Sequence, residues 1–194
     1  MPLMVHIGNT PMPLTDILAE LRKGDILTHC FHGLEHGILD EQGFVLDEVK
    51  EAVKKGVNLD VGHGRGSFSF DVAEKALSQG VLPSTISSDL HGYNVFGSVY
   101  SLATTISKFL HLGLSLEETL AKVTSVPAKI LGINECLGSL RKGSIADISI
   151  FKLRSGSFYL EDTMGKIVKA KKLLEPMAVV KCGRLYASKL KLFW

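Results

Sequence analysis

The sequence predicts a mixed α/β fold in which short parallel strands alternate with helices and a small β-rich part follows. Up to Gly132, apolar runs of about five residues alternate with segments whose apolar residues recur at helical spacing. Beyond about Leu137 the helical spacing stops, and the apolar runs are separated by Gly, Asp and Pro. The 194 residues are few for a closed eight-stranded α/β barrel, which typically needs about 250 residues.

The first part of the chain is expected to contain four consecutive βα units. Each expected strand is a short apolar run, and each following helix has one apolar face. Repeated units with short connections favour a parallel sheet with right-handed crossovers. A Ser115–Glu118 capping box predicts the start of a further helix, and Pro127 starts a short one. The expected strands are 3–7, 25–28, 57–61 and 83–88, and the expected helices are 14–21, 46–56, 72–77 and 102–112.

Two domains are expected from this change of pattern. Residues 1–136 are interpreted as part of an α/β barrel, and residues 137–194 as a small β-rich domain. Residues 190–194, which are apolar and aromatic, are interpreted as a tail. The expected strands of the second part are 146–151, 157–160, 166–170 and 178–182.

Composition excludes several classes of protein. Hydrophobic residues make up 45% of the chain and charged residues 22%, which is ordinary for a soluble globular protein. The net charge is +2 and the basic residues are dispersed, so no nucleic-acid partner is expected. No apolar run reaches the roughly 18 residues of a membrane span, so no membrane partner is expected either. Cys30, Cys136 and Cys182 form no CxxC pair, which favours reduced thiols and a cytoplasmic location.

The chain opens almost directly on a buried-strand pattern, Leu3-Met4-Val5-His6-Ile7, with no leader before it. Native domains rarely begin inside a core strand. We therefore expect this sequence to be the tail of something longer.

Polar side chains follow each of the four expected strands, at His6, His29, His63 and Asp89. Because the carboxyl ends of parallel strands meet at one edge, we expect these side chains to lie near one another. Imidazole and carboxylate groups bind Zn²⁺ while leaving a position open for water. The metal lowers the pKa of that water, and an aspartate beside it can accept the proton. The sequence therefore predicts a catalytic zinc site.

Simpler explanations apply to each residue alone. A single histidine at a strand end is more often a hydrogen-bonded rim residue than a ligand, and Asp89 could cap the following helix. The repetition in four successive units favours a site. The glycine run at residues 62–66 lacks the lysine and spacing of a phosphate-binding loop. The remaining histidines and Cys30 are interpreted as follows: loop or substrate contacts for His32, His36 and His91, a structural role for His111, and packing for Cys30.

These motifs together resemble barrel strands five to eight of the amidohydrolase superfamily. Within it they resemble the deacetylase subgroup, which is often labelled dihydroorotase-like. The similarity extends to about Tyr186 and includes the closing segment that leads into the family's β-sandwich. It implies the C-terminal half of a (β/α)8 TIM barrel with a small C-terminal β-sandwich portion. The motifs are LMVHIG from Leu3, DILTHCFHG from Asp25, DVGHGRGSF from Asp60 and ISSDLH from Ile86, with matching segments at 104–108, 125–129 and 137–147.

The resemblance also implies roles for individual residues. His6 and His29 would bind one metal of a binuclear site, which is usually zinc. Asp89 would be a further metal ligand and the general acid/base. His63 would lie near the carboxylate or carbonyl of the substrate, and Gly64 and His91 are the other candidate substrate-binding residues. The implied reaction is hydrolysis of an amide or ester, which removes an acyl group from a small carboxylated substrate.

The sequence also departs from the family pattern. The family's His-x-His pair and its carboxylated lysine would both lie before Met1. Ser98, Ser101 and Ala103 stand where the family has Pro, Asp and Pro. Two hypotheses therefore remain: a metal-dependent deacetylase, or a truncated and catalytically silent product that acts only by association. In either case the open edges of a half barrel predict marginal stability or a homo-oligomer.

Overall fold

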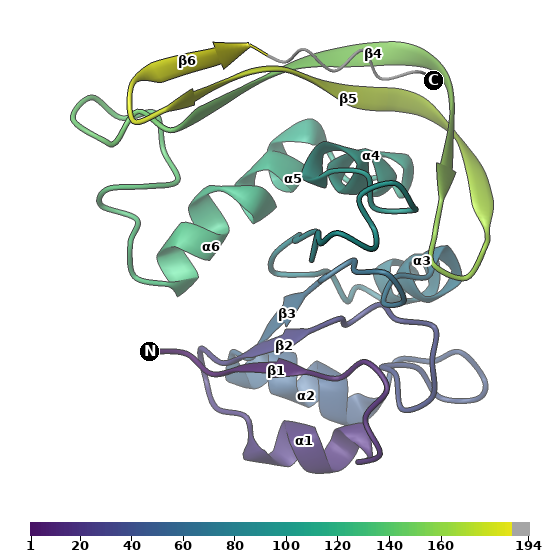
Figure 1. Ribbon diagram of the computed structural model, residues 1–194. Helices are drawn as coiled ribbons and strands as arrows, with labels where there is room; N and C mark the ends of the chain where they lie inside the picture. The colour runs from purple at the N-terminus through teal and green to yellow at the C-terminus, as the bar shows by residue number, and fades with distance from the viewer. Residues whose placement is uncertain (188–194) are drawn as a thin grey trace.

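The computed structural model describes residues 1–187 and shows two sheets with helices between them (Figure 1). The tail expected at 190–194 lies outside these residues. The elements in chain order are β1 (Met4–His6), α1 (Leu14–Glu20), β2 (Ile26–Thr28), α2 (Asp47–Lys55), β3 (Asn58–Asp60), α3 (Phe70–Ser78), α4 (Leu102–His111), α5 (Leu116–Val123), α6 (Ser125–Ile130), β4 (Ile148–Glu161), β5 (Ile167–Lys181) and β6 (Arg184–Ala187).

The first sheet is parallel, with the order β1-β2-β3. Val5 pairs with Leu27, and Leu27 pairs with Leu59, so the three strands are in step and end together. Leu27 and Leu59 are both fully buried. Helices α1 and α2 lie along one side of this sheet, and α4, α5 and α6 lie beyond its other side (Figure 1). The first three predicted βα units are confirmed.

The fourth expected strand, 83–88, is not a regular strand. Its pairing with β3 is a single parallel bridge between Asp60 and Thr85. The segment still runs beside β3, because Val61 N–H donates to Thr85 O at 3.2 Å and His63 N–H donates to Ser87 O at 3.1 Å. Ile86 N–H points away from β3 and donates to Lys122 O of α5, so it adds nothing to this pairing. Pro83 has no N–H to donate and limits the pairing further.

Local signals fix the ends of the helices. The Ser115 hydroxyl accepts from Glu118 N–H while the Glu118 carboxylate accepts from Ser115 N–H, so the predicted capping box is confirmed. Ser69 and Ser101 cap the starts of α3 and α4 in the simpler one-way manner. Helix α2 ends at Gly56, whose φ of 97° is the left-handed conformation that closes many helices.

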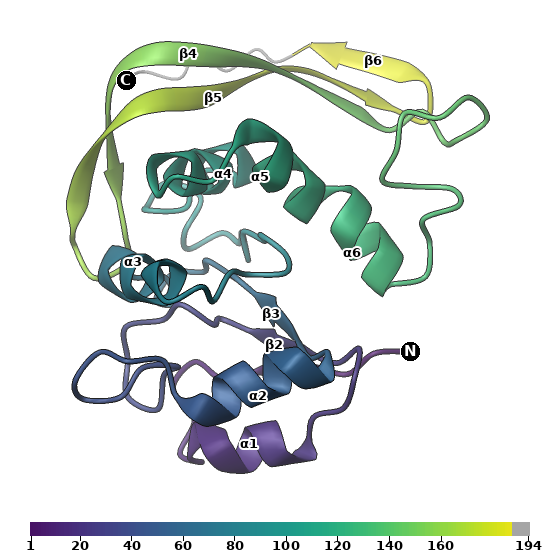
Figure 2. The ribbon, with the colours of Figure 1, turned by 180° about the vertical axis from the view of Figure 1, so that it is seen from behind.

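The second sheet is antiparallel, with the order β4-β5-β6, and it arches over α4, α5 and α6 (Figures 1 and 2). The prediction of four short strands here is wrong, because β4 and β5 are long strands that each span two of the predicted ones. Register shifts between Ile150 and Phe151, and between Ser155 and Phe158, let each strand continue through its irregular stretch. Such bulges accommodate an extra residue and bend the strand.

The antiparallel β4–β5 hairpin packs on the rest of the molecule. Leu174 N–H donates to the Ser107 hydroxyl of α4 at 2.9 Å. Phe158, Leu160 and Leu173 belong to the same buried cluster as the residues around the parallel sheet. The part before residue 137 and the part after it therefore share one core. The domain boundary itself stays a prediction.

The turn between β4 and β5 braces the loop that follows β3. Phe68 N–H donates to the Thr163 hydroxyl at 3.1 Å, and Thr163 N–H donates back to Phe68 O at 3.0 Å. Phe70 N–H donates to the buried Asp162 carboxylate at 2.9 Å. Residues almost a hundred positions apart thus hold the start of α3 in place.

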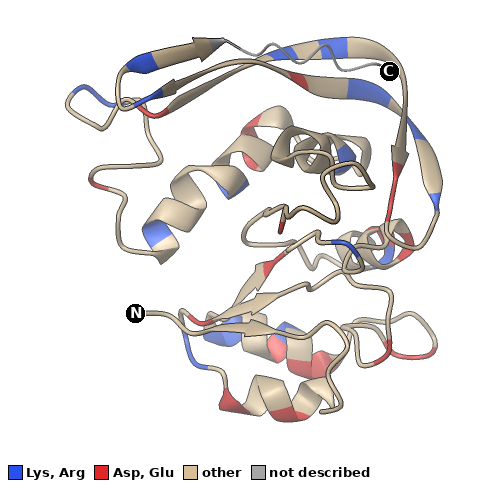
Figure 3. Ribbon diagram, viewed as in Figure 1, with Lys and Arg blue, Asp and Glu red and all other residues tan. Residues whose placement is uncertain are grey.

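Charged positions are numerous along α1, α2 and α3 and along the β4–β5 hairpin (Figure 3). Lys169, Lys171 and Lys172 of β5 are exposed. Lys166 instead pairs with Asp71 at 2.7 Å and Glu74 at 3.1 Å on α3. Within residues 1–187, no helix has the length and apolar character that a membrane crossing requires.

Candidate metal and substrate site

His6 and His29 lie together at the carboxyl edge of the parallel sheet. His6 is the last residue of β1 and His29 directly follows β2, where Thr28 pairs with His6. The centroids of the two imidazole rings are 4.2 Å apart, and the rings meet edge to face at 78°. The predicted convergence of these two histidines is therefore present.

A backbone carbonyl fixes one nitrogen of each ring. His29 Nδ1 lies 2.5 Å from Gly62 O, and His6 Nε2 lies 2.8 Å from Gly8 O. A carbonyl oxygen can only accept, so each of these ring nitrogens carries the hydrogen. Burial lowers the pKa of His29, which favours its neutral ring. In the neutral rings, His29 Nε2 and His6 Nδ1 then keep the lone pairs that bind metals.

Asp89 reaches the same edge from the segment beside β3. Its φ is 44°, a left-handed conformation that is uncommon for residues other than glycine. A Cβ on Gly64 would lie 2.7 Å from Asp89 Oδ2 and 3.6 Å from the Ser67 hydroxyl, and a Cβ on Gly8 would lie 3.4 Å from that hydroxyl. The negative charge of Asp89 also raises the pKa of His29, against the larger effect of burial. Asp89 and the histidines therefore share one neighbourhood.

The donor chemistry fits a zinc-type ion, but the set is incomplete. Two imidazoles with fixed tautomers suit such an ion, and a catalytic zinc site needs about three protein ligands. Within residues 1–187, no three His, Cys, Asp or Glu side chains form a group that could hold a metal ion. Such a site would need a rearrangement of Asp89 or donors from outside these residues.

His63 lies deeper than its predicted role requires. The ring is fully buried and stacks on Phe68 with the centroids 4.7 Å apart. His63 Nδ1 lies 3.0 Å from Gly64 O, and His63 Nε2 lies 2.6 Å from Lys108 Nζ. Burial, followed by the positive charge of Lys108, lowers the pKa of His63 to about 3. Both ring nitrogens are engaged, so His63 supports the loop that carries Gly64.

Lys108 of α4 is a buried cation that sequence reasoning missed as a functional candidate. Its Nζ donates to Ser98 O at 2.7 Å and to Glu161 O at 2.6 Å, besides its contact with His63. Burial lowers the pKa of Lys108 to about 7. One side chain thus ties three segments together: the loop after β3, the loop before α4 and the end of β4.

Asp60 at the end of β3 is a second residue that sequence reasoning missed. Its carboxylate is buried and accepts from the hydroxyls of Thr28 at 2.7 Å, Thr85 at 2.5 Å and Ser87 at 2.6 Å. These three hydroxyls come from β2 and from the segment beside β3. Asp60 therefore holds together the strand ends that carry the histidines and Asp89. The sequence feature that could have pointed to Asp60 is the hydroxyl residues that directly precede His29 and Asp89.

The remaining candidates occupy different environments. His91 and His36 are exposed, and His91 Nδ1 accepts from Tyr93 N–H at 3.3 Å. His111, which is expected to be structural, lies edge to face with Phe70, with the ring centroids 6.0 Å apart. Cys30 is fully buried as expected, and burial raises the pKa of its thiol well above the ordinary value.

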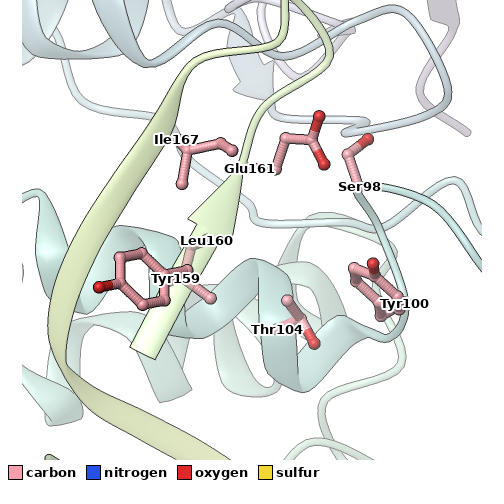
Figure 4. A pocket seen from close by; sticks show the side chains of 7 residues that line it. All are labelled: Ser98, Tyr100, Thr104, Tyr159, Leu160, Glu161 and Ile167. Atoms are coloured by element: carbon pink, nitrogen blue, oxygen red, sulfur yellow. The ribbon is translucent and has the colours of Figure 1, made fainter. Parts of the chain in front are cut away.

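A small pocket of about 110 Å³ lies between the start of α4 and the end of β4 (Figure 4). None of the predicted site residues lines it. Ser98 and Glu161, whose carbonyls bind Lys108, are part of its wall. The residues that line the pocket are Ser98, Tyr100, Thr104, Tyr159, Leu160, Glu161 and Ile167.

Residues 1–185 match the model of the Amidohydrolase family, and the chain belongs to this family. It is 42% identical over 190 residues to a deacetylase of Enterococcus faecalis. The aligned region covers 95% of this chain and 50% of that protein. It is 36% identical over 189 residues to a deacetylase of Agrobacterium fabrum. This aligned region covers 97% of this chain and 46% of that protein. The chain thus spans about half the length of the curated relatives it matches.

Solved structures agree with this family. A crystal structure described as an adenine deaminase superposes with a TM-score of 0.92 at 41% identity, covering 96% of this chain and 51% of that one. A crystal structure described as a dihydroorotase superposes with a TM-score of 0.85 at 34% identity, covering 97% and 49%. The amidohydrolase, deacetylase and dihydroorotase-like resemblance is confirmed, including that the chain matches only part of these proteins.

Proposed function

We propose that this chain supplies strand-end residues of a metal-dependent deacetylase that hydrolyses an amide or ester of a small carboxylated compound. The observation that carries the proposal is the His6–His29 pair, in which one nitrogen of each ring is fixed on a carbonyl. The deacetylase names of the relatives support this reaction class over a silent product. The relationship to longer relatives supports a half barrel whose remaining strands come from elsewhere.

His6 Nδ1, His29 Nε2 and the Asp89 carboxylate are proposed to hold the metal, and zinc fits these donors. A bound divalent ion would activate water and polarise the carbonyl of the substrate. The carbonyls of Gly62 and Gly8 keep each ring in the required tautomer and orientation.

Asp89 is proposed as the general acid/base as well as a ligand. Its carboxylate would accept a proton from the attacking water and return it to the leaving group. The backbone at Asp89 is held in place, because Asn94 Nδ2 donates to Asp89 O at 2.9 Å and Gly64 N–H donates to Ser88 O at 3.1 Å. These contacts fix the backbone from which the carboxylate extends.

His63, Gly64 and His91 are proposed to form the place where the substrate binds. Gly64 leaves space beside Asp89, since a side chain there would meet the carboxylate. The buried His63 acts indirectly by holding Gly64, whereas the exposed His91 can reach a substrate directly. Small carboxylated molecules are the proposed ligands. A cytoplasmic location remains a proposal that rests on the three free cysteines.

The proposal is tested by metal analysis and hydrolysis together. The chain and the Enterococcus faecalis deacetylase are dialysed against zinc, and both are assayed on a panel of N-acetyl and O-acetyl acids. The relative should hydrolyse a member of the panel, and this chain should bind zinc more weakly than the relative. His6→Asn and His29→Asn should remove the zinc bound by this chain, while His111→Asn should leave it unchanged. Zinc binding that survives both substitutions would refute the assigned ligands.

A further inference from the structure

His32 has a buried ring nitrogen with no partner. The residue lies on the loop after β2, three positions beyond His29, and its side chain is 1% exposed. His32 Nδ1 accepts from Leu34 N–H at 3.2 Å. His32 Nε2 has no hydrogen-bond partner, and no other buried side-chain nitrogen or oxygen within residues 1–187 shares this state. Leaving such a group unpaired is unfavourable, so a ligand that pairs with it is favoured.

The contact with Leu34 determines what His32 Nε2 can bind. A backbone N–H can only donate, so Nδ1 must present its lone pair. A neutral imidazole then carries its hydrogen on Nε2. His32 Nε2 is therefore a hydrogen-bond donor and cannot serve as a metal ligand.

His32 borders a pocket at the same edge of the sheet as the histidine pair. The pocket is about 580 Å³ and is lined by residues 32–41 together with Val72. A Cβ on Gly37 would lie 3.5 Å from His32 Cε1, an ordinary contact distance, so Gly37 lies next to the edge of the ring. Glu35, Asp40 and Glu41 contribute acidic side chains to the lining. Their charges disfavour an anionic ligand and leave a neutral carbonyl oxygen as the best acceptor.

We propose that His32 is a substrate-binding residue whose Nε2–H donates a hydrogen bond to the carbonyl oxygen of an acyl group. The acyl group would lie in the pocket lined by residues 32–41 and Val72. This inference rests on the proposed deacetylase function, because amide and ester substrates both present such an oxygen. It adds a specificity residue that distinguishes a neutral acyl group from a carboxylate.

The test uses the full chain labelled with ¹⁵N-histidine. Long-range ¹H–¹⁵N spectra at pH 7 should show His32 as a neutral ring with its hydrogen on Nε2. Acetamide, a neutral probe with an acyl carbonyl, should shift this signal in a saturable way, and acetate should shift it less. A signal with the hydrogen on Nδ1, or one that acetamide leaves unmoved, would overturn the inference and leave buried water as the partner.

Variants separate a specific donor from a structural role. His32→Phe removes the donor and should weaken acetamide binding by about tenfold, the value of one hydrogen bond of about 1.4 kcal/mol. His32→Gln keeps an N–H donor and should recover part of the affinity, while His111→Asn, which lies outside this pocket, should change nothing. These spectra do not require hydrolysis, so they can succeed if the deacetylase assay fails. Hydrolysis with an unshifted His32 signal would reject only the role of His32.

Discussion

Gly64 and Gly66 lie in the same loop but have different surroundings. Gly64 has a φ of 51°, and a Cβ there would lie 2.7 Å from Asp89 Oδ2. No atom lies within 4 Å of a Cβ on Gly66, whose φ is outside the left-handed range. The backbone and the Asp89 carboxylate therefore favour a glycine at position 64, whereas nothing in the surroundings requires one at position 66.

This difference gives a matched pair of substitutions. Gly64→Ala should lower the free energy of unfolding by about 1–3 kcal/mol, because it adds a strained backbone and a collision with Asp89. Gly66→Ala should stay within about 0.5 kcal/mol of the original chain. Urea unfolding followed by circular dichroism measures both values. Equal stability of the two variants would show that Gly64 has no special packing against Asp89.

Lys108 should give the molecule a measurable dependence on pH. Its pKa is about 7 in the folded chain and 10.5 without the fold. Between these values the unfolded chain binds more protons at this site, so the free energy of unfolding should rise with pH. The rise from this residue is at most about 1.4 kcal/mol per pH unit. Below pH 7 the contribution is absent, because both states are protonated.

Urea unfolding at pH 7, 8 and 9 tests this effect. Lys108→Met should be less stable overall and should lose the part of the slope that comes from Lys108. Lys171→Met, at an exposed position of β5, should keep the slope of the original chain. The same slope in all three proteins would contradict the shifted pKa of Lys108.

Sequence reasoning located the residues whose positions follow from strand order. His6 and His29 end adjacent strands, so their convergence follows from the parallel pairing of β1 with β2. Lys108 was not identified because a lysine near a helix end usually faces solvent. Its burial depends on Glu161 and His63, which are 53 and 45 residues away in the sequence. No local pattern contains that information.

At the level of elements, the β4–β5 hairpin shows why strand boundaries were wrong. Gly156 and Pro176 appeared to end strands, yet each lies in a strand that continues past it. Pro176 pairs with Phe151 directly at a register shift, where a missing N–H is tolerated. The helices were predicted better, because caps such as Ser115 act within a few residues.

The same hairpin contains a matched pair of leucines. Leu173 is 1% exposed within the shared core, whereas Leu153 of the paired strand is 39% exposed. Leu173→Ala should lower the free energy of unfolding by about 2–4 kcal/mol, because it leaves a cavity in a packed core. Leu153→Ala should cost less than about 1 kcal/mol. Thermal unfolding compares them, and similar losses would mean that the hairpin is not part of the core.

At the level of the whole molecule, the parallel sheet has an open edge at β1. Leu3 and Met4 are 57% and 55% exposed there, and β1 pairs with β2 on one side only within the described residues. An unpaired strand edge is a template for association with another chain. The family and the mixed α/β class were predicted from the sequence. Whether another strand pairs with the free edge of β1 depends on partner chains, which the sequence does not specify.

We expect the chain to associate through this edge. Size-exclusion chromatography with light scattering should show a dimer or larger species at micromolar concentration. Met4→Lys places a charge on the edge and should shift the population towards monomer. Met12→Lys, at a position that is 50% exposed but outside the strand, is the control and should leave the distribution unchanged. A stable monomer with a sharp unfolding transition in the original chain would contradict this expectation.

The bonds from Phe68 and Phe70 to Asp162 and Thr163 have a consequence for biosynthesis. A ribosome completes β1, β2 and β3 long before it reaches the turn that braces the loop after them. During synthesis that loop therefore lacks its contacts with Asp162 and Thr163 until the β4–β5 hairpin has emerged. Premature termination before residue 163 would release a polypeptide whose parallel strands are all present but whose loop is unbraced.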